Sequence, residues 1–197
     1  MDIKNYIGKY LEETEEMIRL IDTLSIAKMI EVLERIKNNK GRLFILGVGG
    51  SAANASHAVN DFRKIVGIES YTPVDNVAEL TAWTNDLGFE FIFVKWLEIS
   101  KLNKNDCVMV LSVGGGTDTT SKNLVLAMDY AKEAGACIVS IVSRDGGKAI
   151  KVSDACILIP TVAKKRITPH AEAWQGLLLH LIVNALEPKQ KYEPRHS

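Results

Sequence analysis

The sequence predicts an α/β protein in three layers, built on a doubly wound sheet of five parallel strands. Short runs that are apolar throughout are typical of strands buried on both faces of a parallel sheet. Five such runs occur, at Arg42–Gly47, Ile68–Thr72, Asp106–Ser112, Ala136–Val142 and Ala155–Pro160. Helix-like stretches lie between and after them, at Ala52–Lys64, Asn76–Asn85, Phe89–Ser100, Asn123–Ala134, Gly147–Val152 and Thr168–Leu186. Strands that alternate with helices in this way predict helices on both faces of the sheet.

Two further helices are predicted before the first strand. Apolar residues recur every three or four positions from Ile3 to Leu24, and again from Ile26 to Lys37. We therefore expect one domain over 1–197, with a helical hairpin at 1–40, an α/β core at 41–187 and a flexible tail at 188–197. The hairpin packs either on the core of its own chain or on another subunit.

Composition argues against several classes of function. The 197 residues contain 24 Lys and Arg and 24 Asp and Glu, so no net charge attracts the chain to nucleic acid or to an anionic membrane. No apolar run approaches the roughly 18 residues of a membrane span, and the N-terminus lacks the apolar core of a signal peptide. The three cysteines lie far apart in apolar runs, as buried thiols do. These features predict a cytoplasmic protein.

A glycine-rich loop follows the first predicted strand. It runs Gly47-Val48-Gly49-Gly50-Ser51-Ala52-Ala53-Asn54 into a helix. Glycines there allow a tight turn and expose amides at a positive helix end, which favours an anion. The run also fits G-x-G-x-x-G/A, so a dinucleotide enzyme is one alternative. That reading requires an acid after the second strand, where Glu69 and Asp75 are only loosely placed.

A second loop, rich in glycine and hydroxyl groups, follows the third strand and runs from Ser112 to Ser121. In a flavodoxin-like strand order the first and third strands are neighbours, so both loops would open into one crevice. Hydroxyls beside helix-start amides suit a phosphate monoester better than a flat nicotinamide, because each phosphate oxygen needs its own donor. The alternative is two ordinary turns between a strand and a helix.

Four titratable residues lie on two of the predicted helices. His57 and Asp61 are four apart and therefore share one helix face, where they could hold a metal or exchange protons. Glu172 and His180 are polar residues of the apolar last helix, eight apart, and this spacing does not force them to converge. The alternative for His180 is a satisfied histidine of the core.

These features together resemble the sugar isomerase (SIS) domain family, and within it the phosphoheptose isomerases. The resemblance is most specific at Gly49–His57, at Asn85–Phe91 and in the helix that ends at His180. It implies the flavodoxin-like SIS fold and a phosphosugar isomerase. Such an enzyme converts sedoheptulose 7-phosphate to D-glycero-D-manno-heptose 7-phosphate through an enediol, in heptose or surface-polysaccharide precursor biosynthesis.

The resemblance also implies a role for each candidate residue. Asp61 would shuttle the proton and His180 would act as its acid/base partner. A zinc ion could be held by the four positions His57, Asp61, Glu172 and His180. A homotetramer with sites at subunit interfaces is the implied assembly. Residues implied to bind the substrate are Gly49, Gly50, Ser51, Asn54, Asn85, Asp86, Ser112, Thr119, Thr120, Ser121 and Glu172.

The chain departs from the family pattern at several positions. Asp61 stands where the family has Glu, Glu172 where it has Gln, and Ile65 where an Arg is common. The loop from Ser112 to Ser121 is longer than usual. These departures allow a shift in the substrate. A non-catalytic SIS module that binds a phosphosugar or bridges partner proteins is the second hypothesis. Joint presence of the four titratable residues favours catalysis, because a binding module needs none of them.

Overall fold

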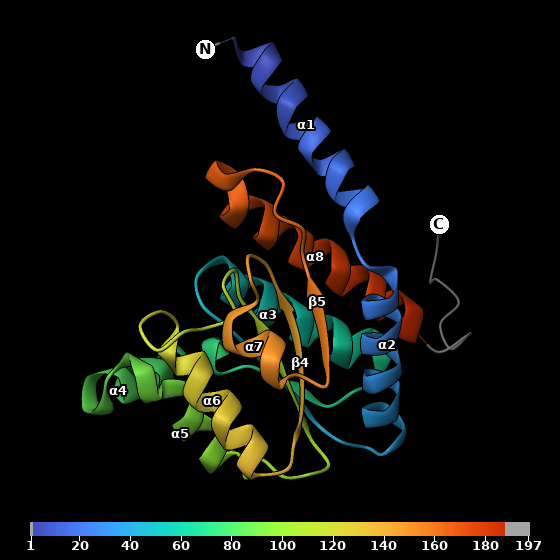
Figure 1. The fold of residues 1–197 in the computed structure, drawn as a ribbon. Coiled ribbons are helices and arrows are strands. Elements are labelled where there is room, and N and C mark those ends of the chain that lie inside the picture. Colours follow the sequence, from blue (N-terminus) through green and yellow to red (C-terminus); the bar gives the residue numbers. More distant parts are fainter. Residues whose placement is uncertain (1, 188–197) are drawn as a thin grey trace, which may run out of the picture.

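A five-stranded sheet separates two layers of helices in the computed structural model, which describes residues 2–187 (Figure 1). The strands are β1 (Leu43–Gly47), β2 (Ser70–Tyr71), β3 (Cys107–Leu111), β4 (Cys137–Val142) and β5 (Ala155–Leu158). All are parallel, in the order β2-β1-β3-β4-β5. This confirms the predicted fold class and strand order. The tail predicted at 188–197 lies outside the described residues.

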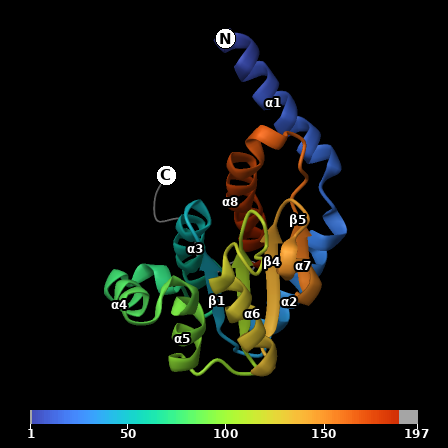
Figure 2. The ribbon, with the colours of Figure 1, turned by 60° about the vertical axis from the view of Figure 1, so that its left-hand side comes forward.

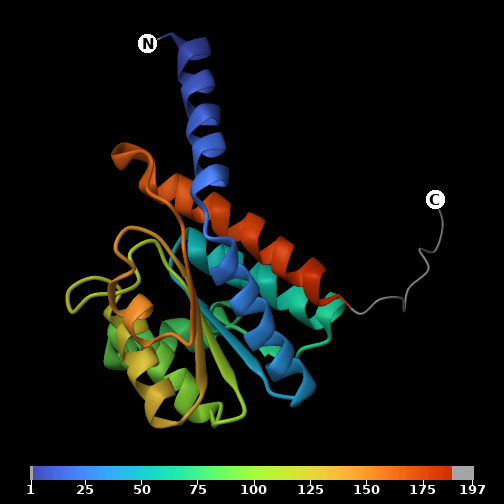
Figure 3. The same cartoon turned by 45° about the vertical axis from the view of Figure 1, so that its right-hand side comes forward.

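Helices cover both faces because the strands are apolar on both sides. Leu43 and Ile45 of β1 point into one core, and Phe44 and Leu46 point into the other. The first core lies beneath α2 (Thr23–Asn38), α3 (Gly50–Asp61) and α8 (Ile167–Leu186), which Figure 3 shows side by side. The second core lies beneath α5 (Ile92–Ile99), α6 (Lys122–Glu133) and α7 (Gly147–Val152), with α4 (Val77–Leu87) at its edge.

The pairing of β1 with β3 decides where the two glycine-rich loops emerge. Leu43 pairs with Cys107, and the register continues to Gly47 opposite Leu111. Both strands therefore end at the same level of the sheet. The loops that follow them open at one carboxyl edge, as the sequence predicts.

Two predicted helices are each divided into two segments. The stretch predicted as Ala52–Lys64 is α3 followed by a π-helical turn, η1 (Phe62–Val66), which ends at Gly67 with φ +81°. The stretch predicted as Phe89–Ser100 begins with a 3₁₀ turn, η3 (Phe89–Phe91), before α5. Two more 3₁₀ turns, η2 (Pro73–Asp75) and η4 (Lys164–Arg166), precede α4 and α8.

The N-terminal helices are present, but the prediction that they form a hairpin is wrong. Helix α1 (Ile3–Leu20) extends away from the body of the molecule instead of folding back along α2 (Figures 1 and 2). The link is Ile21 and Asp22, both extended, with ψ angles of 133° and 104°. Two extended residues do not reverse the chain direction, so the apolar stripe of α1 cannot pack on α2.

A buried ionic cluster holds the second half of α1 against α8. Glu13 is only 7% exposed; its carboxylate accepts hydrogen bonds from Arg166 and lies 2.9 Å from Nε2 of His170. The Tyr10 ring packs on the His170 ring at a centroid distance of 4.5 Å. The hydrogen bond from Arg166, together with the contact to His170, lowers the pKa of Glu13 to about 2.

Two expectations from composition can be compared with the structure. Within residues 2–187, no helix combines the length and the apolar character that a membrane crossing requires. The three cysteines all lie in this part of the chain and are free thiols, with Cys107 buried and the other two half-buried.

Acid should weaken the folded state through Glu13. Because its pKa falls from 4.5 to about 2 on folding, its contribution to stability is complete above about pH 4.5 and is lost as the pH falls towards 2. We expect Glu13→Gln to lower the melting temperature at neutral pH and to show a smaller further loss between pH 4.5 and 2. Calorimetry at stepped pH measures this. Glu16→Gln, an exposed change on the same helix, serves as control; equal acid sensitivity of both variants and the wild type would contradict the prediction.

Candidate active site

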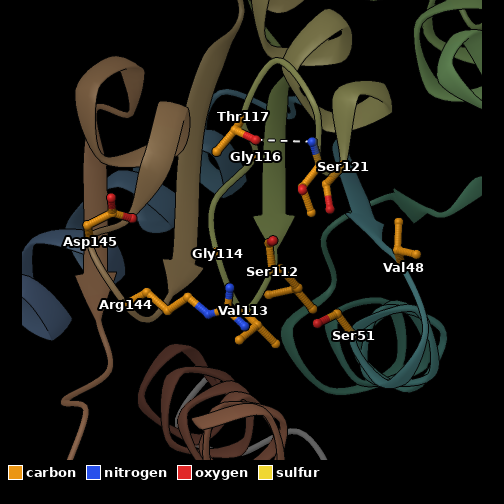
Figure 4. Close-up of a pocket in the computed structure, with 12 residues that line it drawn as sticks. Val48, Ser51, Ser112, Val113, Gly114, Gly116, Thr117, Ser121, Arg144 and Asp145 are labelled. Atoms are coloured by element: carbon orange, nitrogen blue, oxygen red, sulfur yellow. Dashed lines mark hydrogen bonds between the residues drawn. The ribbon is translucent and has the colours of Figure 1, made fainter. Parts of the chain in front are cut away.

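A cavity of about 500 Å³ opens where β1, β3 and β4 end (Figure 4). Residues from three loops line it: Val48 and Ser51 after β1, Ser112, Val113, Gly114, Gly116, Thr117, Thr120 and Ser121 after β3, and Arg144 and Asp145 after β4. Most polar groups here are hydroxyls. The cavity therefore offers hydrogen-bond donors at the carboxyl edge of the sheet, which is where ligands of open α/β sheets bind.

The loop after β1 is fixed by buried hydrogen bonds to α8. Ser51 is 1% exposed, and its Oγ donates to Oε1 of Gln175 at 2.9 Å. Nδ2 of Asn54 donates to the same oxygen at 3.2 Å and to the carbonyl oxygen of Glu172 at 2.9 Å. Gln175 is fully buried, and its Nε2 has no partner among the described residues. Through the side chain of Gln175, α8 thus holds the start of α3 and the cavity wall in place.

Glycine is required twice in this loop. Gly49 caps α3 with φ +64°, a conformation that other residues rarely adopt. A side chain at Gly50 would meet the Glu172 carboxylate, because a Cβ atom there would lie 2.4 Å from Oε2. The sequence predicts both glycines as binding residues; the structure places them beside the cavity, whose wall is formed by Val48 and Ser51.

The loop after β3 turns its hydroxyls towards one another and towards the cavity. Oγ of Ser112 accepts a hydrogen bond from the Gly115 amide at 3.1 Å. Oγ1 of Thr117 accepts from the Thr120 amide at 3.0 Å. Ser121 stands at the N-terminus of α6 with φ +53°. Thr119 lies outside the main cavity and lines a neighbouring one of about 350 Å³.

Arg144 and Asp145 are cavity residues that the sequence analysis missed. They follow β4, and β4 lies next to β3 in the sheet. The predicted strand order already places this third loop at the same edge, so Arg144 could have been found by taking the loops after all three neighbouring strands. The loop after β4 has no run of hydroxyl residues, so its sequence does not mark it as a binding loop.

His57, Asp61 and His180 meet at the far end of α3. Oδ2 of Asp61 lies 3.2 Å from Nε2 of His57 and 3.5 Å from Nδ1 of His180. The two imidazole rings are 5.1 Å apart, edge to face. Asp61 is buried, whereas the side chains of both histidines are more than half exposed. The alternative of a core histidine at His180 is therefore excluded.

These three residues fit a metal ion. One nitrogen from each imidazole and one carboxylate oxygen all lie within 4.8 Å of one another. Two histidines and one carboxylate are a ligand set that zinc uses at catalytic sites, with a further position left open. Glu172 does not belong to this cluster. Eight residues separate it from His180 on one helix, or about 12 Å.

The cavity and the cluster lie at opposite ends of α3. Ser51 lines the cavity and Asp61 belongs to the cluster, and ten residues of helix separate them by about 15 Å. Asn85 and Asp86 are brought to neither place. They are exposed on α4, where Nδ2 of Asn85 donates to Oδ1 of Asp86 at 2.9 Å.

The sequence profile of the SIS domain matches residues 5–143, which include both glycine-rich loops and α3. The chain belongs to the SIS domain family. A phosphoheptose isomerase of Helicobacter pylori (strain P12) is 31% identical over 93% of this chain and 90% of its own length. At 93% of this chain, the match extends beyond the range of the profile.

Solved structures share the fold of this SIS domain. The phosphoheptose isomerase from Neisseria gonorrhoeae has a TM-score of 0.78 at 23% identity, with coverage of 93% of this chain and 96% of that chain. The Vibrio vulnificus NanR protein, complexed with ManNAc-6P, has a TM-score of 0.67 at 16% identity, with coverage of 94% of this chain and 62% of that chain. At these identities the likeness is one of fold.

Zinc binding tests the cluster in this SIS domain. We expect His57→Ala and His180→Ala each to lower zinc affinity by more than about 100-fold, because even loss of a group that only supports a ligand costs 10- to 100-fold. Isothermal titration calorimetry on protein freed of metal measures the affinity. His170→Gln changes a histidine outside the cluster and should bind as the wild type does. Wild-type affinity in both alanine variants would disprove the site.

Proposed function

We propose that the protein is an aldose–ketose isomerase that converts sedoheptulose 7-phosphate to D-glycero-D-manno-heptose 7-phosphate, or acts on a closely related phosphosugar. One observation carries the proposal: a buried carboxylate lies between two imidazoles in a chain of the SIS family. The relative from Helicobacter pylori, a phosphoheptose isomerase, aligns over nearly the whole chain and supports the substrate class.

The reaction moves two protons and leaves the sugar's composition unchanged. In this proposal Asp61 removes the proton from the carbon next to the carbonyl and returns it to the neighbouring carbon. His180, within 3.5 Å of that carboxylate, exchanges the second proton between the two oxygens as the enediol forms and collapses. Zinc held by His57, Asp61 and His180 would supply Lewis-acid stabilisation of the oxyanion.

Phosphate binding is proposed at the cavity. Ser51, Ser112, Thr120 and Ser121 line it, and the amides at the starts of α3 and α6 lie beside it. Binding energy from this remote group would position the open-chain sugar, so that both loops contribute to the rate as well as to affinity. Contacts of the sugar with Gly49, Gly50, Asn54, Thr119 and Glu172 beside this cavity, and with Asn85 and Asp86 on α4, stay predictions.

We further propose that complete sites form between copies of the chain, in a homotetramer. About 15 Å of helix separates the cavity from Asp61, and the two exposed histidines face outwards. Because about 12 Å of helix separates Glu172 from His180 within one chain, a zinc site of four ligands would need Glu172 from a second copy. Exposed apolar residues on two helices support the assembly: Ile3, Ile7, Leu11 and Ile18 on α1, and Leu177 and Leu181 on α8. Cytoplasmic location and a role in surface-polysaccharide precursor synthesis stay predictions.

Turnover of sedoheptulose 7-phosphate by the purified protein, with and without zinc, tests the activity. We expect Asp61→Asn and His180→Ala to lower kcat by about 100- to 10,000-fold, the range for loss of a general acid or base. Asp129→Asn makes the same chemical change at the surface of α6 and should leave the rate unchanged. An inactive wild type in both metal states, or normal turnover by both variants, would show that the assignment is wrong.

Light scattering tests the assembly. We expect the double variant Ile7→Glu, Leu11→Glu to lower the solution mass, because each side chain is more than half exposed on α1 and carries no contact that the fold needs. Ile150→Glu, on α7, makes a similar change at another exposed apolar position and should keep the wild-type mass. An unchanged mass in the double variant would remove α1 from the interface.

The second candidate function is phosphosugar binding without conversion. The likeness in fold to NanR, a protein complexed with ManNAc-6P, favours it. In that case calorimetry would show binding of a sugar phosphate that Asp61→Asn leaves unchanged, and no turnover would accompany it. A dinucleotide enzyme, the remaining alternative, would show a nicotinamide-dependent absorbance change.

A further inference from the structure

Arg144 is the one cationic side chain on the cavity wall within the described residues, and it points inwards. Its side chain extends over Gly114, where a Cβ atom would lie 3.9 Å from Cδ and 4.0 Å from a guanidinium nitrogen. Figure 4 shows the guanidinium group turned towards Val113 and Ser112, while the Asp145 carboxylate lies on the other side of the loop. Oδ1 of Asp145 accepts a hydrogen bond from the Gly147 amide at 3.2 Å. Among the described residues of this wall, the one acidic side chain is therefore engaged in its own loop.

The Arg144 guanidinium is also free to bind a ligand. Arg42 pairs with Asp106 and Arg166 pairs with Glu13, each through short contacts between guanidinium and carboxylate. Within residues 2–187, Arg144 has neither an ion pair nor a hydrogen bond from its side chain to the protein. Its five donors face the cavity and solvent.

The backbone at Arg144 adopts a conformation that is unfavourable for its residue type. Its φ of +55° is in the left-handed region, which is unfavourable for any residue with a Cβ atom except Asn and Asp. Ser121, with φ +53°, is the other non-glycine residue of this kind that lines the cavity. Glycine would fit position 144 without strain, as it does at Gly146 and Gly147. Lys40 and Lys101 have φ angles of +55° and +53° in turns away from the cavity, so the strain at Arg144 is compatible with use of its side chain and does not by itself assign one.

A phosphate monoester is a ligand whose negative charge the Arg144 guanidinium would bind. At neutral pH it carries between one and a half and two negative charges. The serines and threonines of the cavity donate hydrogen bonds but bring no charge, and the nearby Glu172 carboxylate, beside Gly50, adds a negative one. A guanidinium group matches two phosphate oxygens at once.

We infer that Arg144 is the specificity-determining residue that makes this cavity prefer a phosphorylated sugar over the neutral sugar. The identity of the ligand as a phosphosugar rests on the proposed function. The argument that Arg144 binds a phosphate group rests on the cavity alone. Arg144 forms a charge-assisted pair with the phosphate and takes no part in proton transfer, which occurs at the other end of α3.

Calorimetric binding of sedoheptulose 7-phosphate and of sedoheptulose to the full-length protein tests this inference. We expect Arg144→Gln to raise Kd for the phosphate ester by about 10- to 100-fold, the range for a hydrogen bond to a charged group, and to leave Kd for the neutral sugar unchanged. For Arg144→Lys, Kd for the phosphate ester should lie between the values of the wild type and Arg144→Gln. Lysine keeps the positive charge but cannot bind two phosphate oxygens at once as a guanidinium group does. Lys151→Gln, which removes a surface charge on α7 outside the cavity, should bind as the wild type does.

The variant Arg144→Gly tests whether the Arg144 side chain binds the ligand or only stabilises the loop after β4. It should lose the same affinity as Arg144→Gln while its melting temperature stays equal or rises by about 2 °C, because glycine relieves the strained φ. A lower melting temperature together with wild-type affinity for the phosphate ester in Arg144→Gly would show that Arg144 holds the loop and does not bind the ligand, and would overturn the inference. So would wild-type affinity in Arg144→Gln, or an equal loss in Lys151→Gln. Normal selectivity without turnover would instead refute the proposed isomerase and leave the role of Arg144 intact.

Discussion

The packing of α3 on α8 is the contact on which the candidate site depends. Near the start of α3, Ser51 donates to Gln175 through a buried hydrogen bond, and at its end Asp61 lies against His180. The same pair of helices therefore fixes one wall of the cavity and brings together the acid and the histidine. A rotation of α8 about its axis would disturb both places at once. This coupling explains why a polar residue as costly to bury as Gln175 occupies a fully buried position.

Much of this arrangement can be predicted from the sequence because it follows from short-range patterns. Apolar runs define the strands, and the rules for parallel sheets then fix the order and place the loops after β1 and β3 at one edge. The four-residue spacing of His57 and Asp61 likewise places them on one helix face. That His180 joins them does not follow from spacing. It came from the resemblance to a family, and the structure places Nδ1 of His180 3.5 Å from Oδ2 of Asp61.

What the sequence does not reveal depends on the long-range path of the chain. Nothing distinguishes Glu13 from the exposed glutamates around it until α8 brings Arg166 and His170 to its carboxylate. The direction of α1 is set by two link residues whose backbone angles have no signature in the sequence. Likewise, Glu172 lies on the same helix as His180, yet only coordinates show that its carboxylate lies beside Gly50 at the other end of α3.

The two ends of α3 differ in a way that separates recognition from chemistry. Both non-glycine residues with strained backbone on the cavity wall, Ser121 and Arg144, lie at the phosphate end. The cluster of Asp61 and its histidines is instead built on residues with helical backbone, at the junction of α3 with the π-helical turn η1. In the proposed function the loops set which ligand enters, and loops can diverge between relatives. Helices hold the reacting groups in place, so the same proton transfer could persist while the preferred phosphosugar changes.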